Sequence, residues 1–111
     1  MIIPGNWDLP NIILGTNYKY GFIIKEDGYP KDLTSCTVEV KLTNEPDGLE
    51  YTLTTSSGLE IVDLTAGIIE IVLDDSVVNI YSVNEYLYKL RITETTGEIN
   101  CYLEGKIKVR E

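Results

Sequence analysis

The sequence has 111 residues, enough for one domain with a single hydrophobic core, and its 43% hydrophobic and 24% charged content is typical of a globular chain rather than a disordered one. The formal net charge is −9, and positions 26 to 86 hold 13 acidic residues against two lysines. Because an acidic protein repels phosphate backbones and anionic lipid headgroups, nucleic acid and membrane surfaces are excluded as favoured partners.

Residues 1–16 are interpreted as an irregular N-terminal arm and residues 17–111 as the folded domain. Prolines and glycines interrupt the arm, and only Ile12-Ile13-Leu14 has the character of a short strand. The single tryptophan, Trp7, either caps one end of the core or docks the arm on a neighbouring subunit. The first residues lack the basic and long apolar regions of a secretory signal, so we expect a protein that folds in the cytoplasm.

Alternation between apolar and polar residues begins at Tyr18 and predicts a series of strands. Turn sequences such as Asp27-Gly28 and Pro46-Asp47-Gly48 separate them. The strand expected at 68–73 is nearly all apolar, which is typical of a central strand. The strands expected in this part of the chain cover 18–25, 37–43, 51–55, 59–63 and 68–73.

Residues 74–83 are the one candidate helical stretch. Asp74 or Asp75 is suited to the N-cap position, because a carboxylate accepts hydrogen bonds from the free N–H groups of a first helical turn. The stretch is short, so we expect only about one or two turns.

The two final strands, 86–93 and 101–109, form the clearest predicted hairpin, with its turn at Thr96-Gly97. On the outer face, Lys89 meets Glu104 and Tyr102 is exposed. On the inner face, the expected register pairs Tyr88 with Gly105, Leu90 with Leu103, and Ile92 with Cys101.

About seven short strands with turns between them predict an all-β, antiparallel β-sandwich, and a small closed barrel is the alternative architecture. We expect the inward-facing apolar positions of both sheets to form the core. The residues expected there are Phe22, Val38, Val40, Leu42, Ile69, Ile71, Leu90, Leu103 and Ile107.

Motifs for catalysis and metal binding are lacking. The sequence has no histidine, which removes the usual general base and the commonest zinc ligand. Cys36 and Cys101 lack the spacing of a redox or zinc motif, so we expect buried free thiols. The acidic turns at Glu45-Pro46-Asp47 and Asp74-Asp75 lack the spacing of a calcium loop. We predict a protein that is not an enzyme and carries no cofactor or metal.

Eight tyrosines are unusual for this length. Amphipathic rings at a surface are enriched at protein interfaces and at sugar-binding sites. The alternative is that these tyrosines only cover the margins of the core. The sequence therefore leaves open a carbohydrate-binding or host-surface-adhesion module as a second functional class.

The order of turns and strands resembles a known domain family. The motifs that carry the resemblance are Asp27-Gly28, Thr37-Val38-Glu39-Val40-Lys41, Gly58-Leu59-Glu60-Ile61, Ala66-Gly67-Ile68-Ile69, Tyr86-Leu87-Tyr88-Lys89-Leu90-Arg91-Ile92-Thr93 and Leu103-Glu104-Gly105-Lys106-Ile107-Lys108-Val109. Over residues 15–110 the sequence is similar to the immunoglobulin-like domain of tailed-phage virion proteins, typified by the N-terminal domain of baseplate upper proteins.

The resemblance implies an immunoglobulin-like β-sandwich and a structural role in a phage virion, reached after synthesis in the bacterial host cytoplasm. In that family the domain anchors a receptor-binding or fibre protein to the tail, or decorates the virion. Because the sequence stops at Glu111, we expect a stand-alone tail, baseplate or fibre-attachment adaptor. Its partners would be other virion proteins, and the family has no shared catalytic residues to transfer.

Self-association is a further expectation, as a homo-oligomer or as many copies on a particle. The basic outer face of the last hairpin and the acidic body suit head-to-tail contact between copies. The alternative is that neighbouring acids neutralise the basic strip and that the arm folds onto its own core. The candidate contact residues are Trp7, Ile12, Ile13, Lys89, Arg91, Tyr102, Lys106, Lys108 and Arg110.

Overall fold

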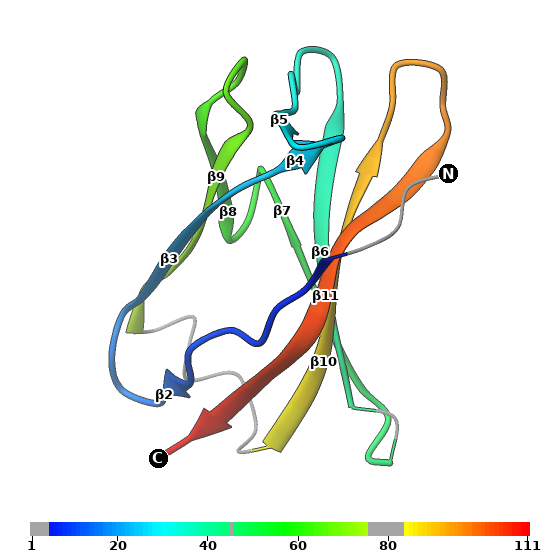
Figure 1. Ribbon diagram of the computed structural model, residues 1–111. Coiled ribbons are helices and arrows are strands. Elements are labelled where there is room, and N and C mark those ends of the chain that lie inside the picture. Colours follow the sequence, from blue (N-terminus) through cyan, green and yellow to red (C-terminus); the bar gives the residue numbers. More distant parts are fainter. Residues whose placement is uncertain (1–4, 45, 76–83) are drawn as a thin grey trace.

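The computed structural model describes residues 5–44, 46–75 and 84–111, and strands make up most of them (Figure 1). Among these residues, seven strands have five or more residues, in agreement with the expected number. The strands are β1 (Gly5–Asn6), β2 (Ile12–Ile13), β3 (Tyr18–Ile23), β4 (Lys25–Glu26), β5 (Tyr29–Pro30), β6 (Thr37–Asn44), β7 (Leu49–Thr54), β8 (Leu59–Asp63), β9 (Ile68–Leu73), β10 (Asn84–Thr93) and β11 (Ile99–Arg110).

Two sheets form the layers of a sandwich. The larger sheet has the order β1-β11-β10-β6-β7, with β2 also paired to β11, and the smaller sheet has the order β3-β9-β8. β4 and β5 form a separate hairpin. All strand pairs of five or more residues are antiparallel. The predicted all-β sandwich is confirmed.

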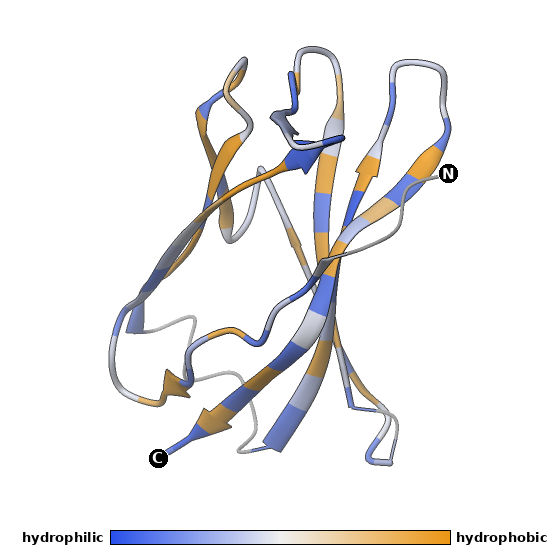
Figure 2. Cartoon of the chain, viewed as in Figure 1, coloured by the Kyte–Doolittle hydropathy of each residue, from blue (hydrophilic) through white to orange (hydrophobic). Residues whose placement is uncertain are grey.

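The core lies between the two sheets, where alternate residues of each strand point inward. Figure 2 shows this alternation as bands of opposite hydropathy along β6, β10 and β11. Seven of the nine expected core residues are buried, whereas Phe22 and Leu103 are partly buried and pack at its margin. The seven are Val38, Val40, Leu42, Ile69, Ile71, Leu90 and Ile107.

The structure confirms the predicted register of the β10–β11 hairpin for Tyr88 and Leu90. Between Leu90 and the turn, the predicted register is wrong. Tyr88 lies opposite Gly105 and Leu90 opposite Leu103, as expected. A bulge then shifts the pairing, so that Ile92 faces Asn100 instead of Cys101. A bulge sets two residues of one strand against one of its partner, and alternation of side chains breaks there. Tyr102 is consequently buried, at 5% exposure, and the expectation that it lies on the outer face is wrong.

The N-terminal arm lies against its own domain. β1 and β2 both pair with β11 in parallel, at Leu103–Glu104 and at Val109–Arg110. Leu9, which lies between the two strands, and Ile12, which begins β2, are buried in the core. Of the two alternatives for the arm, the structure therefore shows the one in which it folds onto its own core, because its apolar residues cover the margin of the sandwich beside β11.

The predicted helical stretch at 74–83 lies almost wholly outside the described residues. No helix in the described ranges is long and apolar enough to span a membrane.

Candidate binding groove

At one margin of the sandwich, β3 of the smaller sheet faces the arm that runs along β11 (Figure 1). A groove of about 600 Å³ lies between these two segments. We call it the edge groove. Its walls are formed by Gly5, Asn6, Trp7 and Leu9 of the arm, by Tyr20, Gly21, Phe22, Ile23 and Lys25 at and after β3, and by Leu103 of β11.

Three aromatic side chains line the edge groove. Tyr20 and Phe22 are two positions apart on β3, so both face inward, and their ring centroids are 6.0 Å apart. The indole Nε1 of Trp7 donates a hydrogen bond of 3.0 Å to the Tyr20 hydroxyl. Trp7 is nevertheless 59% exposed. Two rings supported by the core and one largely exposed ring thus form an apolar surface that faces solvent, with a polar edge at the indole and the phenol.

The position of Trp7 is fixed through its backbone. Its N–H donates to the carbonyl oxygen of Glu104, and its own carbonyl oxygen accepts a hydrogen bond from the Tyr88 hydroxyl. Burial, followed by the charge of Asp8, raises the pKa of Tyr88 to about 12, so this hydroxyl stays protonated and able to donate at neutral pH. Gly105 lies directly beneath this crossing, where a side chain would overlap Trp7.

The charge of the edge groove differs from that of the whole chain. Lys25 is the charged residue in its lining, and no acidic residue lines it. No ion pair of Lys25 is found among the described residues. In a protein with 18 acidic and nine basic residues, an opening that carries only a cation is suited to a neutral or acidic ligand.

The candidate contact residues do not form one surface. Trp7 lies in the edge groove and Ile13 is 41% exposed, whereas Ile12 and Tyr102 are buried in the chain's own core. Those last two residues therefore do not offer a surface to a partner.

The five basic candidates lie on the outer face of the large sheet, but acids lie among them. Lys89 is opposite Glu104, Arg91 opposite Glu39, and Lys108 opposite Glu85. The Nζ of Lys106 lies 3.9 Å from a carboxylate oxygen of Glu85. The face is therefore of mixed charge, as the alternative interpretation supposed, and Arg110 extends it to the end of β11.

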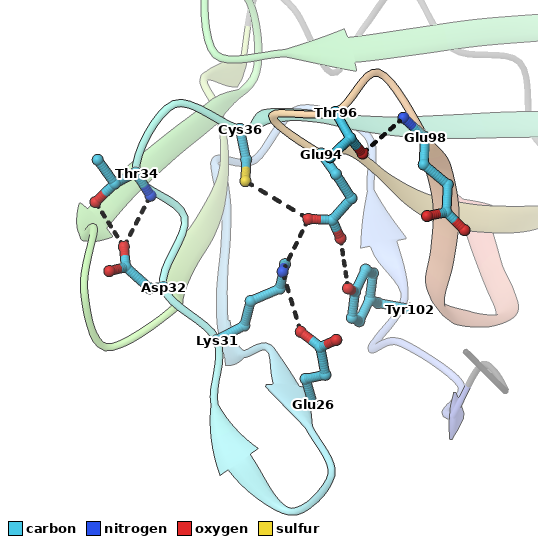
Figure 3. A network of polar contacts seen from close by, with 9 residues as sticks. All are labelled: Glu26, Lys31, Asp32, Thr34, Cys36, Glu94, Thr96, Glu98 and Tyr102. Carbon is cyan, nitrogen blue, oxygen red and sulfur yellow. Dashed lines mark hydrogen bonds and ion pairs between the residues drawn. The ribbon is translucent and has the colours of Figure 1, made fainter. Parts of the chain in front are cut away.

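A partly buried ionic network lies at the end of the sandwich beside the β4–β5 hairpin (Figure 3). Lys31, at 9% exposure, places its Nζ 2.9 Å from a carboxylate oxygen of Glu94 and 3.1 Å from one of Glu26. The Tyr102 hydroxyl donates to Glu94 at 2.6 Å, and the Cys36 thiol lies 3.8 Å from the same carboxylate. Lys31 also lies 5.4 Å from the centre of the Tyr102 ring.

The pKa values of this network reflect competing effects. Burial alone lowers the pKa of Lys31, but its hydrogen bonds to Glu94 and Glu26 outweigh it and hold that pKa above its usual value. Burial alone raises the pKa of Glu94, but hydrogen bonds from Tyr102 and Lys31 hold it below its usual value. Both groups therefore stay charged at neutral pH. The network joins the segment after β5 to the β10–β11 hairpin and has a structural role.

Sequence reasoning found neither the edge groove nor this network. Trp7 and Tyr20 are 13 positions apart and lie in different segments, and Lys31 and Glu94 are 63 positions apart. One signal was available, because a glycine inside a strand, such as Gly105, often marks the close approach of another backbone. No cluster of three or more Cys, Asp or Glu side chains arranged to hold a metal occurs in the part of the chain that the structure describes.

The comparisons with known proteins give a likeness of structure and none of sequence. No protein-family model matches the chain, and no curated protein matches it significantly. Its fold is similar to that of a phage domain. The N-terminal domain of phage TP901-1 ORF48 matches with a TM-score of 0.57 and 13% identity, over 97% of this chain and 98% of that one. The predicted resemblance to a tailed-phage domain is confirmed for the fold.

Proposed function

We propose that this chain is a structural protein of a phage virion, an immunoglobulin-like adaptor in a tail, baseplate or fibre attachment that acts through protein–protein contacts. The observation that carries the proposal is the likeness in fold to the N-terminal domain of phage TP901-1 ORF48 over nearly the whole of both chains. The absence of histidine, which removes the commonest catalytic base, supports a non-catalytic role.

The surface of the domain supports a role in contacts. Exposed apolar side chains occur in the edge groove and also on the outer face of the smaller sheet. Those on the outer face include Ile23, Val62 and Val72. Ile23 pairs with Ile68 and Lys19 pairs with Val72, at the two ends of β3, so these side chains are separate candidate contacts rather than one patch. The mixed-charge outer face of the large sheet adds Lys89, Arg91, Lys106, Lys108 and Arg110 as candidate contacts between copies or with other virion proteins.

Mass spectrometry of purified particles from the host culture tests this role. We expect the protein in multiple copies per particle, in fixed ratio to a tail protein. Its presence in the infected cell together with its absence from purified particles would contradict the proposal. Light scattering coupled to size exclusion, at low and high salt, tests contact between copies. A monomer at every protein concentration and salt would leave only heterologous partners.

Carbohydrate binding is a second candidate, because one observation favours it. The fold brings Trp7, Tyr20 and Phe22 to one groove, and rings grouped at an opening are the usual platform for a sugar. A glycan array decides between the two. Selective binding that is lost in Trp7→Ala and kept in Tyr29→Ala would favour this candidate, since Tyr29 is 75% exposed and lies outside the groove.

A further inference from the structure

We propose that β3 binds an extended segment of a partner protein as an added strand, whose alternate side chains enter the edge groove. The inference rests on the proposed function and names the kind of partner that the groove accepts: an unfolded or loop segment that is neutral or acidic. It follows from the backbone of β3, from the groove beside it and from the local charge.

Along the edge of β3 that faces away from β9, the backbone groups have no partner strand among the described residues. The N–H of Ile24 donates to the carbonyl oxygen of Gly67, in line with the β3–β9 register. Because backbone groups alternate between the two edges of a strand, Tyr18, Tyr20 and Phe22 also bond toward β9. In agreement, the N–H of Val72, opposite Lys19, donates to Gly58 on the far side of β9.

It follows that the remaining residues of β3 direct their N–H and C=O groups to the free edge. These residues are Lys19, Gly21 and Ile23. β3 is an edge strand of its sheet, and no hydrogen bond of these groups to another described segment is found. Such a row is a template for strand pairing. The arm does not fill this role, since its backbone pairs with β11. Its hydrogen bonds to β3 involve tyrosine side chains: the Trp7 indole donates to the Tyr20 hydroxyl, and the Tyr18 hydroxyl donates to the carbonyl oxygen of Pro10.

The edge groove adds pockets to this template. An added strand would point every second side chain inward, toward Trp7, Tyr20, Phe22 and Leu103. Main-chain bonds to an edge supply affinity and such side-chain contacts supply specificity in strand addition.

The charge of this edge selects among peptide segments. Lys25 lines the edge groove without an acidic neighbour in the lining. Lys19 at the other end of β3 is 66% exposed, and its Nζ is 3.9 Å from Glu70. A segment with apolar or small residues at its centre and an acidic residue near Lys25 complements this edge.

Amide hydrogen exchange, with a display library of random short peptides as the probe, tests the proposal. Peptides selected on the intact protein are synthesised and added to it. We expect the amides of Lys19, Gly21 and Ile23 to be slowed on binding, whereas those of the alternating residues that bond to β9 are slow already. Binding that leaves the three amides unchanged, or a library that yields no binder, would overturn the proposal.

Gly21→Pro provides the matched variant. It removes the outward N–H and leaves the bonds to β9 in place, since proline is tolerated where a strand edge faces solvent. We expect about tenfold weaker peptide binding in Gly21→Pro and nearly unchanged binding in Gly21→Ala, which keeps the N–H. If Gly21→Pro does not fold, backbone N-methylation of the peptide removes the same hydrogen bonds from the other partner. Equal binding by either altered partner would contradict strand addition.

Incorporation of the variants into virions distinguishes strand addition from the proposed structural role. We expect Gly21→Ala to enter virions and Gly21→Pro to be excluded. Entry of both variants would overturn strand addition and leave the structural role intact, whereas absence of the unaltered protein would refute that role. Glycan binding that Trp7→Ala abolishes and Gly21→Pro preserves would also overturn strand addition and favour a sugar in the groove.

Discussion

The carbonyl oxygen of Trp7 lies so close to Gly105 that it would clash with a Cβ at that position. Gly105 lies opposite Tyr88 in the β10–β11 hairpin, and the Tyr88 hydroxyl donates to that same oxygen. A residue without a side chain, a buried phenol and the backbone of the arm thus form one contact. The backbone of the arm takes up the space that a side chain at Gly105 would need.

This contact predicts that Gly105→Ala destabilises the domain by about 1–3 kcal/mol, because the new methyl group displaces the arm. Urea denaturation followed by the fluorescence of Trp7, the only tryptophan, measures the change. Gly21→Ala is the control, since its Cβ would lie 3.3 Å from the flexible Glu70 side chain, and we expect a change within about 0.5 kcal/mol. A Gly105→Ala variant as stable as the parent would show that the arm does not cross there.

Deletion of residues 1–10 is expected to destabilise the monomer. The deletion removes Leu9, which is buried, together with the hydrogen bonds of Trp7 and Leu9 to β11. Loss of one buried leucine side chain costs about 2–5 kcal/mol. A lower midpoint of thermal unfolding, at a protein concentration where the chain is monomeric, would bear this out. An unchanged midpoint would mean that the arm contributes nothing to the core.

Lys31→Ala is expected to cost about 1–3 kcal/mol, because Glu94, whose side chain is only 17% exposed, would lose its cation. Lys41→Ala is the matched control. Lys41 pairs with Glu50 at 3.1 Å on the surface, where their side chains are 31% and 56% exposed, and such pairs contribute about 0–1 kcal/mol. Chemical denaturation at neutral pH compares the two variants, and equal losses would contradict a stabilising role for the network.

The pH dependence of stability follows from Glu94. Its pKa in the folded protein is held below the value of an unfolded chain, so its contribution is complete above about pH 4.3 and is lost as the pH falls through the folded value. In Glu94→Gln the side chain does not titrate, so the variant lacks this pH-dependent contribution at every pH. We expect the difference in unfolding free energy between parent and variant to narrow from pH 6 toward about pH 3. A difference that is constant over this range would exclude the linkage.

Both thiols are expected to be free. Cys36 and Cys101 form no disulfide in the structure, and burial raises the pKa of each. Alkylation of the denatured, unreduced protein should therefore add two labels, and the native protein should react slowly because little thiolate is present at neutral pH. Mass spectrometry reads both results. Failure of the denatured protein to take up label would reveal a disulfide.

The sequence predicted the parts of the fold in which alternation is unbroken. The predicted strands and inward faces of β6 and β10 are confirmed, because every second residue from Val38 to Leu42 and from Tyr86 to Ile92 is apolar and buried. The face of Tyr102 was wrong, because a single-residue bulge leaves no mark on composition and reverses the alternation.

Contacts between distant segments could not be predicted in the same way. Lys31 and Glu94 meet only because the β4–β5 hairpin lies beside the β10–β11 hairpin, and each residue alone resembles an ordinary surface charge. The edge groove likewise depends on where the arm crosses β11. The glycine at position 105 indicated that something lies close, but not that the arm does so.

The parallel pairing of β1 and β2 with β11 has a consequence for synthesis on the ribosome. The arm emerges first, yet its partner strand is among the last residues of this sequence to be translated. Leu9 and Ile12 therefore remain uncovered during nearly the whole of translation of this segment, until β11 has left the exit tunnel. Such late closure of a long loop is slow and leaves apolar segments open to chaperones or to neighbouring nascent chains.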